Sequence, residues 1–227
     1  RKSNMNYLFV VAHPDDEVLG AGATIHRLIR EGYNVSVCML SSQCNTRYDE
    51  SLVVSMKDSH AILGIEKAYV GKFKCLCFKD ESHQEMVQFI ENAIVDSNAD
   101  VIFTHHPTDL NNDHYITSLL CQEAARLPQR QICDCNKIKA IYFMEVQSST
   151  DWSFNTAWEQ FRPNTFNEIQ YEDLMRKLSA LDVYDKVIRT APHPRSYENI
   201  EALVRYRGSQ SGFEYAEAFE CIFNLGV

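Results

Sequence analysis

Short apolar runs alternate with longer amphipathic stretches along most of the chain. Residues 7–11 form an apolar run like those of strands buried on both faces, and residues 18–31 place apolar side chains at helical spacing. The same patterns predict further strands at 34–40, 68–70, 74–78, 100–104, 138–146, 166–169 and 215–223, and further helices at 50–63, 82–97, 113–126, 171–189 and 197–207. This alternation predicts an α/β fold: a Rossmann-like three-layer sandwich with a mostly parallel sheet and helices on both faces.

The sequence contains no shift in composition that would mark a linker and no internal repeat. Residues 1–227 are therefore predicted to form a single domain. Residues 1–4, which precede the first methionine, are interpreted as a leftover of cloning and are not used in the fold prediction. Residues 151–167 carry aromatic side chains among polar ones and are predicted to be an ordered extended segment that leads into a strand.

Composition narrows the class of protein. Of the 227 residues, 45% are hydrophobic and 23% charged, as in ordinary globular proteins, and the net charge of −9 argues against a nucleic-acid partner, which would require a basic face. No apolar run approaches the roughly 20 residues that span a bilayer, so no membrane span is predicted. No secretory signal is recognised, and a cytoplasmic location is predicted.

Eight cysteines are spread along the chain. Two pairs have Cys-x-Cys spacing, which differs from the Cys-x-x-Cys spacing of zinc ribbons and redox motifs. Reduced structural thiols are favoured over disulfides or a sulfur-ligated metal. The positions are Cys38, Cys44, Cys75, Cys77, Cys121, Cys133, Cys135 and Cys221.

A histidine and three carboxylates follow the first predicted strand, in the run His13-Pro14-Asp15-Asp16-Glu17. Open α/β sheets bind their ligands at the carboxyl ends of the strands. Clustered carboxylates raise one another's pKa, and a bound cation such as zinc would relieve the repulsion. The alternative is that the three acids only stabilise the N-terminus of the following helix.

A second polar loop, 105–114, follows the strand predicted at 100–104. Both strands end at the same rim, so Asp113 and His114 are within reach of a cation held by His13 and Asp16. Two histidines and one carboxylate with an open position make up a catalytic zinc site. In the alternative interpretation, which we favour for His105, the first two histidines of the loop merely end the strand and Asp113 caps a helix.

These residues carry a resemblance to a known family. The sequence A-H-P-D-D-E at 12–17 and the pattern D-x-N-x-D-H at 109–114 resemble the PIG-L/LmbE-like family of zinc-dependent sugar N-deacetylases. The closing stretch, 193–219, is also similar to the C-terminal part of many members. The resemblance extends over nearly the whole chain, although its motifs occupy a small part of it.

The resemblance implies a reaction and roles for particular residues. His13, Asp16 and His114 correspond to the zinc ligands, and Fe²⁺ or another divalent ion is an alternative to Zn²⁺. Asp15 corresponds to the general base that takes a proton from the attacking water. The implied reaction hydrolyses the N-acetyl amide of an N-acetylglucosamine-type sugar and releases acetate and a free amine. The acidic composition favours a soluble, small-molecule sugar conjugate over a membrane glycolipid.

The sequence departs from the family at Asn111, where many members carry a histidine. An amide can donate a hydrogen bond to an oxyanion but cannot supply a proton at neutral pH. His193 is therefore a candidate proton donor, with a histidine in a surface turn as the alternative. Asp113, without its usual histidine partner, is expected to orient a neighbour or cap its helix.

Two residues are predicted to bind substrate. Arg47 corresponds to an arginine that contacts substrate in relatives, and Asp109 is expected to line the sugar pocket together with Asn112. A solvated loop arginine is the alternative for Arg47. The aromatic residues of 152–161 are expected to pack in the core, with stacking on a sugar ring as the alternative.

Three other functions are alternatives to deacetylation. A metallo-phosphoesterase would need ligands for two metals, and the sequence clearly offers ligands for one. A non-catalytic, metal-containing sugar- or nucleotide-binding module would have no use for the spare carboxylate of Asp15. A dinucleotide-binding protein is disfavoured because no G-x-G-x-x-G follows the first strand. The oligomeric state is not predicted.

Overall fold

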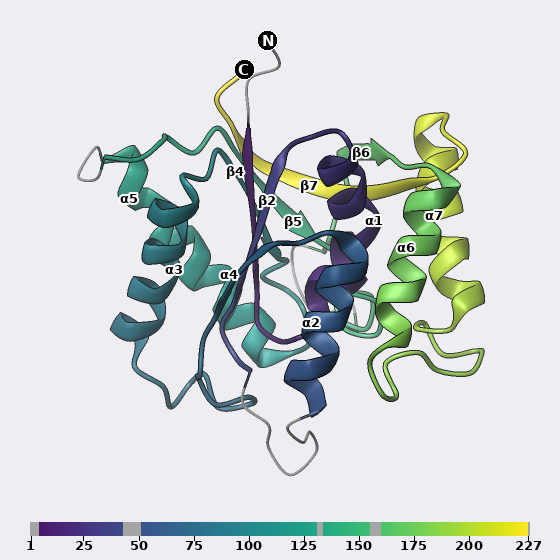
Figure 1. Cartoon of the computed structure of the whole chain (residues 1–227), viewed down its shortest axis with the longest axis horizontal. Coiled ribbons are helices and arrows are strands. Elements are labelled where there is room, and N and C mark those ends of the chain that lie inside the picture. Colours follow the sequence, from purple (N-terminus) through teal and green to yellow (C-terminus); the bar gives the residue numbers. More distant parts are fainter. Residues whose placement is uncertain (1–4, 43–50, 131–133, 155–159, 227) are drawn as a thin grey trace.

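The computed structural model describes residues 5–42, 51–130, 134–154 and 160–226. Its described strands form a seven-stranded sheet in the order β3-β2-β1-β4-β5-β7-β6. Figure 1 shows the strands running between helices on two sides. The strands are β1 (Asn6–Val11), β2 (Asn34–Met39), β3 (Lys67–Val70), β4 (Val101–His105), β5 (Ala140–Met144), β6 (Thr165–Glu168) and β7 (Ala216–Asn224).

The order of the strands reverses in the middle of the sheet, next to β1. Strands β1 to β5 pair in parallel, whereas β7 pairs antiparallel with both β5 and β6, so the prediction of a mostly parallel sheet is confirmed. From β1 the chain builds outward to β2 and β3, then returns to place β4 and β5 on the other side of β1. Ligands bind where strand order reverses in this way, here at the carboxyl ends of β1 and β4.

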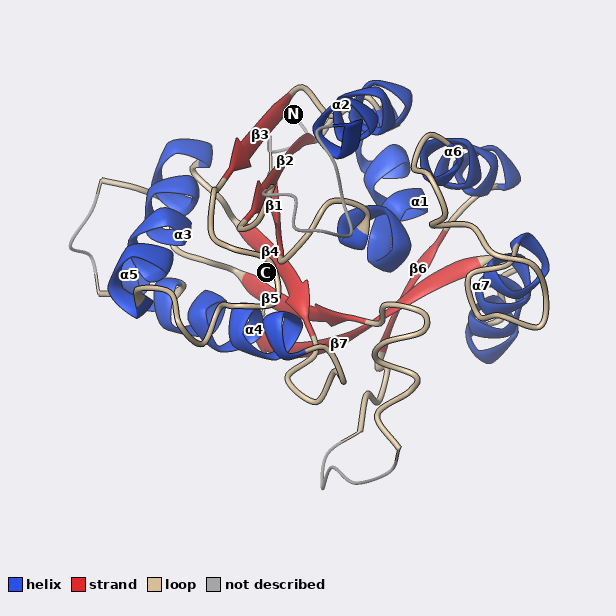
Figure 2. Cartoon of the chain, turned by 90° about the horizontal axis from the view of Figure 1, so that it is seen from below, coloured by secondary structure: helices blue, strands red, loops and turns tan. Residues whose placement is uncertain are grey.

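Helices cover both faces of the sheet, as the sequence predicts (Figure 2). Two sets of helices pack into two separate apolar clusters, one on each face. One face carries α1 (Asp16–Arg30), α2 (Ser51–Leu63), α6 (Tyr171–Asp182) and α7 (Tyr197–Ser211); the other carries α3 (His83–Ser97), α4 (Asn112–Ala124) and α5 (Arg126–Gln129).

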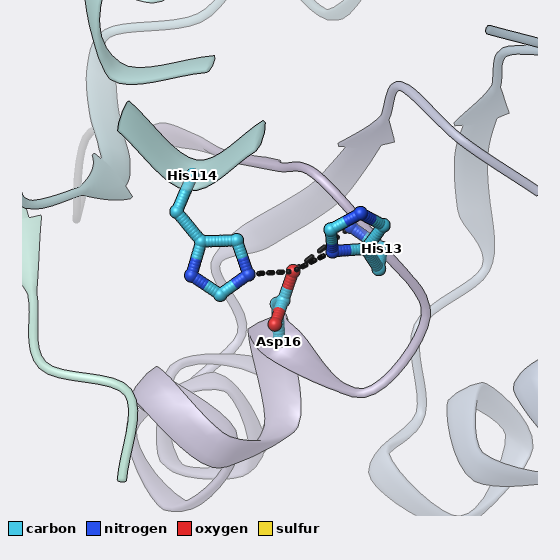
Figure 3. Close-up of side chains that lie close together, drawn as sticks. All are labelled: His13, Asp16 and His114. Carbon is cyan, nitrogen blue, oxygen red and sulfur yellow. Dashed lines mark hydrogen bonds and ion pairs between the residues drawn. The ribbon is translucent and has the colours of Figure 1, made fainter. Parts of the chain in front are cut away.

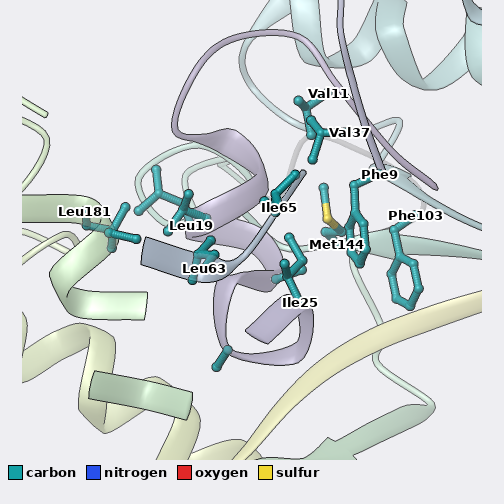
Figure 4. Close-up of a cluster of buried hydrophobic side chains, with 14 of the residues drawn as sticks. Phe9, Val11, Leu19, Ile25, Val37, Leu63, Ile65, Phe103, Met144 and Leu181 are labelled. Carbon is teal, nitrogen blue, oxygen red and sulfur yellow. The ribbon is translucent and has the colours of Figure 1, made fainter. Parts of the chain in front are cut away.

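The alternation of side chains along β1 explains its uniformly apolar sequence. Phe9 and Val11 pack beneath α1, whereas Leu8 and Val10 belong to the cluster on the opposite face. All four side chains are completely buried. On the α1 face, Phe9 stacks on Phe103 of β4 with ring centroids 4.7 Å apart (Figure 4). The strand that leads to the polar loop is therefore held firmly on both sides.

Helix α1 is broken near its middle, and a buried ion pair fills the break. Ala21 has non-helical backbone angles (φ −153°, ψ 17°). The backbone N–H groups of Ala23 and Thr24 donate to Glu217 at 3.3 and 2.7 Å. Lys177 pairs with Glu217 at 2.7 Å and donates to a backbone carbonyl before the break. Lys177 of α6 and Glu217 of β7 thus satisfy backbone groups that the break exposes.

Two predicted elements are wrong. Residues 74–78 form turns rather than a strand, because Leu76 has a positive φ of 63° and its N–H donates to the carboxylate of Asp113 at 2.6 Å. The helix predicted at 171–189 ends at Asp182, and residues 183–189 form turns that bring Tyr184 into the core.

The described cysteines are mostly free thiols. Cys38, Cys75, Cys77, Cys121 and Cys221 are unpaired, as predicted, but Cys135 is disulfide-bonded, so the prediction of reduced thiols is wrong there. Among the described residues, no helix has both the length and the apolar character needed to cross a bilayer.

Candidate metal and catalytic site

Three predicted ligand side chains point toward one another near the carboxyl ends of β1 and β4 (Figure 3). The Oδ2 atom of Asp16, the first residue of α1, lies 3.4 Å from Nδ1 of His13 and 3.2 Å from Nε2 of His114 in the first turn of α4. Zinc bonds of about 2.0–2.1 Å in tetrahedral geometry place neighbouring ligand atoms about 3.3 Å apart. The donor set and the two distances to Asp16 are compatible with a single zinc-like ion, and all three ligand atoms lie within 4.8 Å of one another.

A second carboxylate stands behind each imidazole of this cluster. His13 Nε2 lies 3.0 Å from Asp113 Oδ2, and His114 Nδ1 lies 3.1 Å from Asp109 Oδ2. A carboxylate accepts hydrogen bonds, so each imidazole donates from that nitrogen. The nitrogen that faces Asp16 is then the one that can bind a metal, once the metal displaces its proton. Such partners orient the histidine ligands of metal sites and fix their tautomers.

Asp109 faces the interior rather than an open pocket. Besides His114, it accepts hydrogen bonds from Thr150 Oγ1 at 2.8 Å and from the Ser149 hydroxyl. Its exposed fraction is 6%. This position differs from the predicted one in the sugar pocket and corresponds to that of a residue that orients His114.

Asp113 connects the cluster to the loop that replaces the predicted strand. Its Oδ2 atom contacts His13 and accepts the N–H of Leu76, and its Oδ1 accepts the N–H of Phe78 at 3.4 Å. The expectation that Asp113 orients a neighbour agrees with this contact. The same loop brings the Cys75 thiol next to His13 and Asp113.

His105 lies deeper in the site than the sequence suggested. Its Nε2 accepts the N–H of Ala12 at 3.0 Å and lies 3.5 Å from Asp16 Oδ2, and its ring stacks on His114 with centroids 3.9 Å apart. Because the backbone N–H occupies the lone pair of Nε2, this nitrogen is not available to a metal. Burial and the charge of His114 lower the pKa of His105. His105 therefore packs behind the cluster as a neutral ring.

The surroundings of Asp16 stabilise its ionised form. Burial alone would raise its pKa, but His114 and His105 outweigh burial and hold the pKa well below its usual range. Burial likewise opposes the charge of His114, yet Asp16 and Asp109 raise its pKa to about 9. For His13, Asp113 and Asp16 overcome burial and raise the pKa well above its usual range. Without a metal, protons balance the carboxylates, and a metal would displace them.

Asp15 differs from Asp16 in both conformation and charge. It adopts the left-handed backbone region with φ 93° and makes no capping hydrogen bond through its side chain, so the helix-cap interpretation is wrong for this residue. Its carboxylate lies 3.6 Å from Arg195 Nη1. Burial raises the pKa of Asp15 to about 7, with Arg195 opposing and Asp16 adding to the rise. A carboxylate with such a pKa suits proton transfer near neutral pH.

Glu17 points away from the cluster. Its Oε1 lies 2.9 Å from His60 Nε2 on α2, and both side chains are buried. The third acid of the motif therefore links α1 to α2.

Asn111 and His193, which were predicted to bind the oxyanion and to donate a proton, lie in different surroundings. Asn111 caps α4, because its Oδ1 accepts the N–H of Asp113 at 2.9 Å. His193 is partly exposed; its Nδ1 accepts the N–H of Arg195 at 3.0 Å, and its ring packs edge-on against Trp152. Burial and nearby arginines lower the pKa of His193. Arg47, the predicted substrate-binding arginine, lies outside the described residues.

Arg195 is a site residue that the sequence analysis did not single out. Its Nε donates to the Gln147 carbonyl at 3.1 Å and to Ser148 Oγ at 2.8 Å, which leaves the rest of the guanidinium next to Asp15. The only indication in the sequence was that Arg195 lies in the stretch 193–219, which is similar to the C-terminal part of many family members. Nothing in the sequence indicated that Ser149 and Thr150 donate hydrogen bonds to Asp109.

Two aromatic side chains that were expected to pack in the core lie at the surface. Trp152 is 43% exposed and Phe154 73% exposed, so the core prediction for the aromatic residues of 152–161 is wrong for these two.

Two other groups of side chains in the described part of the chain are close enough to hold a metal. One consists of His13, Cys75 and Asp113, and the other of His105, Asp109 and His114. Each shares a histidine with the first cluster, so neither group is independent of that cluster.

An α/β fold with two imidazoles, one carboxylate and a spare basic carboxylate at the carboxyl ends of its strands is typical of single-metal hydrolytic enzymes. Comparison with known families gives the narrower class. Residues 8–125, just over half of the chain, match the family model described as PIG-L, GlcNAc-PI de-N-acetylase, and the chain belongs to this family.

Individual relatives share low sequence identity with this chain. An uncharacterized deacetylase, YaiS, from Escherichia coli K12 is 27% identical over 188 residues, which cover 77% of this chain and 87% of that protein. The N,N'-diacetylchitobiose deacetylase of Pyrococcus horikoshii has a similar structure, with TM-score 0.73, 18% identity and coverage of 95% of this chain and 83% of its own.

The same fold also occurs in a protein with a different reaction. GalB, the 4-carboxy-2-hydroxymuconate hydratase of Pseudomonas putida KT2440, aligns with TM-score 0.78 and 18% identity over 98% of both chains. Similarity at this level establishes the fold alone, so the reaction must be argued from the family and from the site itself.

Proposed function

We propose that this protein is a zinc-dependent N-deacetylase that hydrolyses the N-acetyl amide of an N-acetylglucosamine-type sugar or soluble conjugate. The family match and the deacetylases among its relatives support deacetylation. One observation carries the proposal: His13 and His114 both approach Asp16 Oδ2, at 3.4 and 3.2 Å, and the next carboxylate in the chain, Asp15, has a pKa raised to about 7.

His13, Asp16 and His114 would hold the metal. A bound zinc ion supplies Lewis-acid polarisation of the amide carbonyl and makes a nearby water more acidic. Asp113 and Asp109 keep the two imidazoles in the tautomer that presents a lone pair. Fe²⁺ would suit the same nitrogen and oxygen ligands.

Asp15 is the general base. Its carboxylate takes a proton from the attacking water as the water oxygen bonds to the amide carbon. The C–N bond then breaks, and the amine leaves with a proton returned by Asp15 or donated by His193. The Asn111 amide group donates a hydrogen bond to the developing oxyanion.

The remaining residues act on binding and orientation. Arg47 is proposed to contact the substrate, as the family resemblance implies. For Asp109 we now propose a positioning role through His114, because its oxygens already accept hydrogen bonds from Ser149 and Thr150. A cytoplasmic location remains a prediction from the sequence.

The direct test measures free amine and acetate released from a panel of N-acetylglucosamine conjugates by metal-free and zinc-reloaded protein. Zinc-dependent release of both products in equal amounts is expected. Absence of release from every conjugate, with zinc bound at one ion per chain, would contradict the proposal.

Two alternatives are decided in the same assay. Release of inorganic phosphate from phosphorylated sugars in place of acetate would identify a phosphoesterase. Saturable binding of the conjugates without turnover, unchanged in the Asp15→Ala variant, would identify a binding module.

A further inference from the structure

The His13 ring carries a second set of possible metal ligands on the side opposite Asp16. Nδ1 of His13 lies 3.4 Å from Asp16 Oδ2, whereas Nε2 lies 3.0 Å from Asp113 Oδ2. Ligand atoms of His13, Cys75 and Asp113 all lie within 4.8 Å of one another. Nitrogen, carboxylate oxygen and thiolate sulfur together suit zinc and other ions that bind sulfur well.

The backbone around Cys75 holds its thiol in this position. The N–H groups of Leu76 and Phe78 donate to the Asp113 carboxylate at 2.6 and 3.4 Å, so the chain on the C-terminal side of Cys75 is fixed. Cys75 is 8% exposed and Leu76 54% exposed, and the Cys75 thiol forms a hydrogen bond with His13. The loop therefore presents the thiol to the ring and turns the neighbouring leucine outward.

The spacing of these groups allows an ion to replace the proton between His13 and Asp113. Tetrahedral zinc with bonds of about 2.0–2.1 Å separates nitrogen and oxygen ligands by about 3.3 Å, so the 3.0 Å pair needs to open only slightly. A zinc–sulfur bond of about 2.3 Å requires the sulfur roughly 3.5 Å from both partners. Cys75 has a single side-chain torsion that moves its sulfur, and the sulfur already lies within 4.8 Å of both ligand atoms.

Occupation of this position would change the ring that the proposed catalytic ion needs. A second ion must displace the proton that Nε2 donates to Asp113, because metal ligands bind in their deprotonated form. Asp113 then no longer orients His13 through a hydrogen bond, and such orienting partners matter for the affinity and activity of a metal centre. The anionic groups Asp16, Asp113 and the Cys75 thiolate surround the shared ring and offset the charge of two dications.

We propose that His13, Cys75 and Asp113 form a second metal site, which zinc fills when it exceeds one ion per chain, and that its occupation inhibits turnover. The site shares His13 with the proposed catalytic centre but uses the opposite nitrogen of the ring. It gives Cys75 a role beyond the structural thiol that the sequence analysis favours. The inhibition rests on the proposed deacetylase function, whereas the binding of the second ion does not.

Cobalt(II) measures the second site without an activity assay. Co²⁺ takes zinc positions, and a thiolate ligand adds an intense charge-transfer absorption in the ultraviolet. In a titration of metal-free protein, we expect this absorption to be absent during the first equivalent and to appear during the second. Its appearance during the first equivalent, or its absence throughout, would overturn the proposal.

Variants assign the absorption to one of the cysteines. Cys75→Ala and Cys75→Ser should both abolish the absorption of the second equivalent, and two replacements are used so that unfolding of one does not decide the result. Cys77→Ser is the matched control, because this free, half-buried cysteine lies two residues away and should retain the absorption. Unchanged absorption in either folded Cys75 variant would overturn the site.

Zinc affinity and inhibition are measured on the same variants. Competition with a chelator should show that Cys75→Ala weakens the second zinc by more than the roughly 10- to 100-fold typical of losing a residue that only orients a ligand. Excess zinc should inhibit the unsubstituted protein and Cys77→Ser but not Cys75→Ala, with each activity expressed relative to its own value at one zinc per chain. Equal inhibition of all three proteins would overturn the proposal.

The same measurements separate this proposal from the deacetylase function. A Cys75-dependent absorption at the second equivalent, without acetate release from any conjugate at one zinc per chain, would retain the second site and contradict the deacetylase function. Zinc-dependent acetate release without a Cys75-dependent absorption at any cobalt ratio would support the deacetylase and overturn the second site.

Discussion

The candidate site has an inner and an outer side that differ in how firmly their residues are held. Residues of the inner side are at most 6% exposed, and each contacts at least one other member of the group. Residues of the outer side are partly exposed and come from irregular segments. The inner side consists of Asp16, His105, Asp109 and His114; the outer side consists of Asp15, Trp152, His193 and Arg195.

Asp15 and Asp16 illustrate the difference most clearly, because they are adjacent in sequence. Imidazoles hold the pKa of Asp16 well below its usual range, whereas burial raises the pKa of Asp15 to about 7. The first environment favours a permanent anion and therefore a metal ligand. The second favours a group that gains and loses a proton. Two adjacent carboxylates are therefore suited to different roles: Asp16 to binding a metal ion and Asp15 to transferring a proton.

The largest effect is expected from removing an inner ligand. His114→Ala removes one imidazole from the three-residue set and takes from Asp109 the ring that it orients. Bound zinc, measured by atomic absorption, should be lost, and acetate release should fall to the level of metal-free protein. Full zinc content in a folded His114→Ala protein would show that the metal lies elsewhere.

A smaller effect is expected from a residue that acts through a ligand. Asp109→Asn keeps the shape but weakens the hydrogen bond that orients His114, and losses of this kind reduce metal affinity about 10- to 100-fold. Zinc affinity by competition with a chelator measures this change. The control is Asp96→Asn, an exposed carboxylate that pairs with Lys67, which should leave affinity unchanged. Equal affinities in both variants would remove Asp109 from the metal centre.

The smallest effect is expected from removing Arg195, the outer residue that lowers the pKa of Asp15. Asp15 must be unprotonated to act as base, so activity should rise with pH through its pKa and then level off. Arg195 lowers that pKa, and Arg195→Met should therefore move the rise to higher pH. One unit of movement lowers activity on the acid side about tenfold. The pH profile of kcat/KM measures it, with Arg205→Met, an exposed arginine paired with Glu201, as control. An unmoved profile would separate Arg195 from Asp15.

The three candidate metal ligands could be predicted because they lie in short motifs at strand ends. His13, Asp16 and His114 follow two buried strands, and the β-α pattern places those strands at one rim. The role of His105 could not be predicted, because it depends on the register that brings its ring to the N–H of Ala12.

The outer side could not be predicted from periodicity. Arg195 and Trp152 lie in turns whose conformation depends on individual hydrogen bonds, such as that from Arg195 to the Gln147 carbonyl. The same reason explains the wrong strand at 74–78, where the buried carboxylate of Asp113 captures backbone N–H groups that the strand pattern assigns to a sheet.

The division of roles between adjacent carboxylates is the central claim, and one paired measurement tests it directly. Zinc content and acetate release are compared for Asp15→Asn and Asp16→Asn. Asp15→Asn should retain one zinc per chain while kcat falls by about 10²- to 10⁴-fold, the usual contribution of a general base. Asp16→Asn should lose the zinc itself. Retained turnover in Asp15→Asn, or loss of zinc from it, would contradict the account.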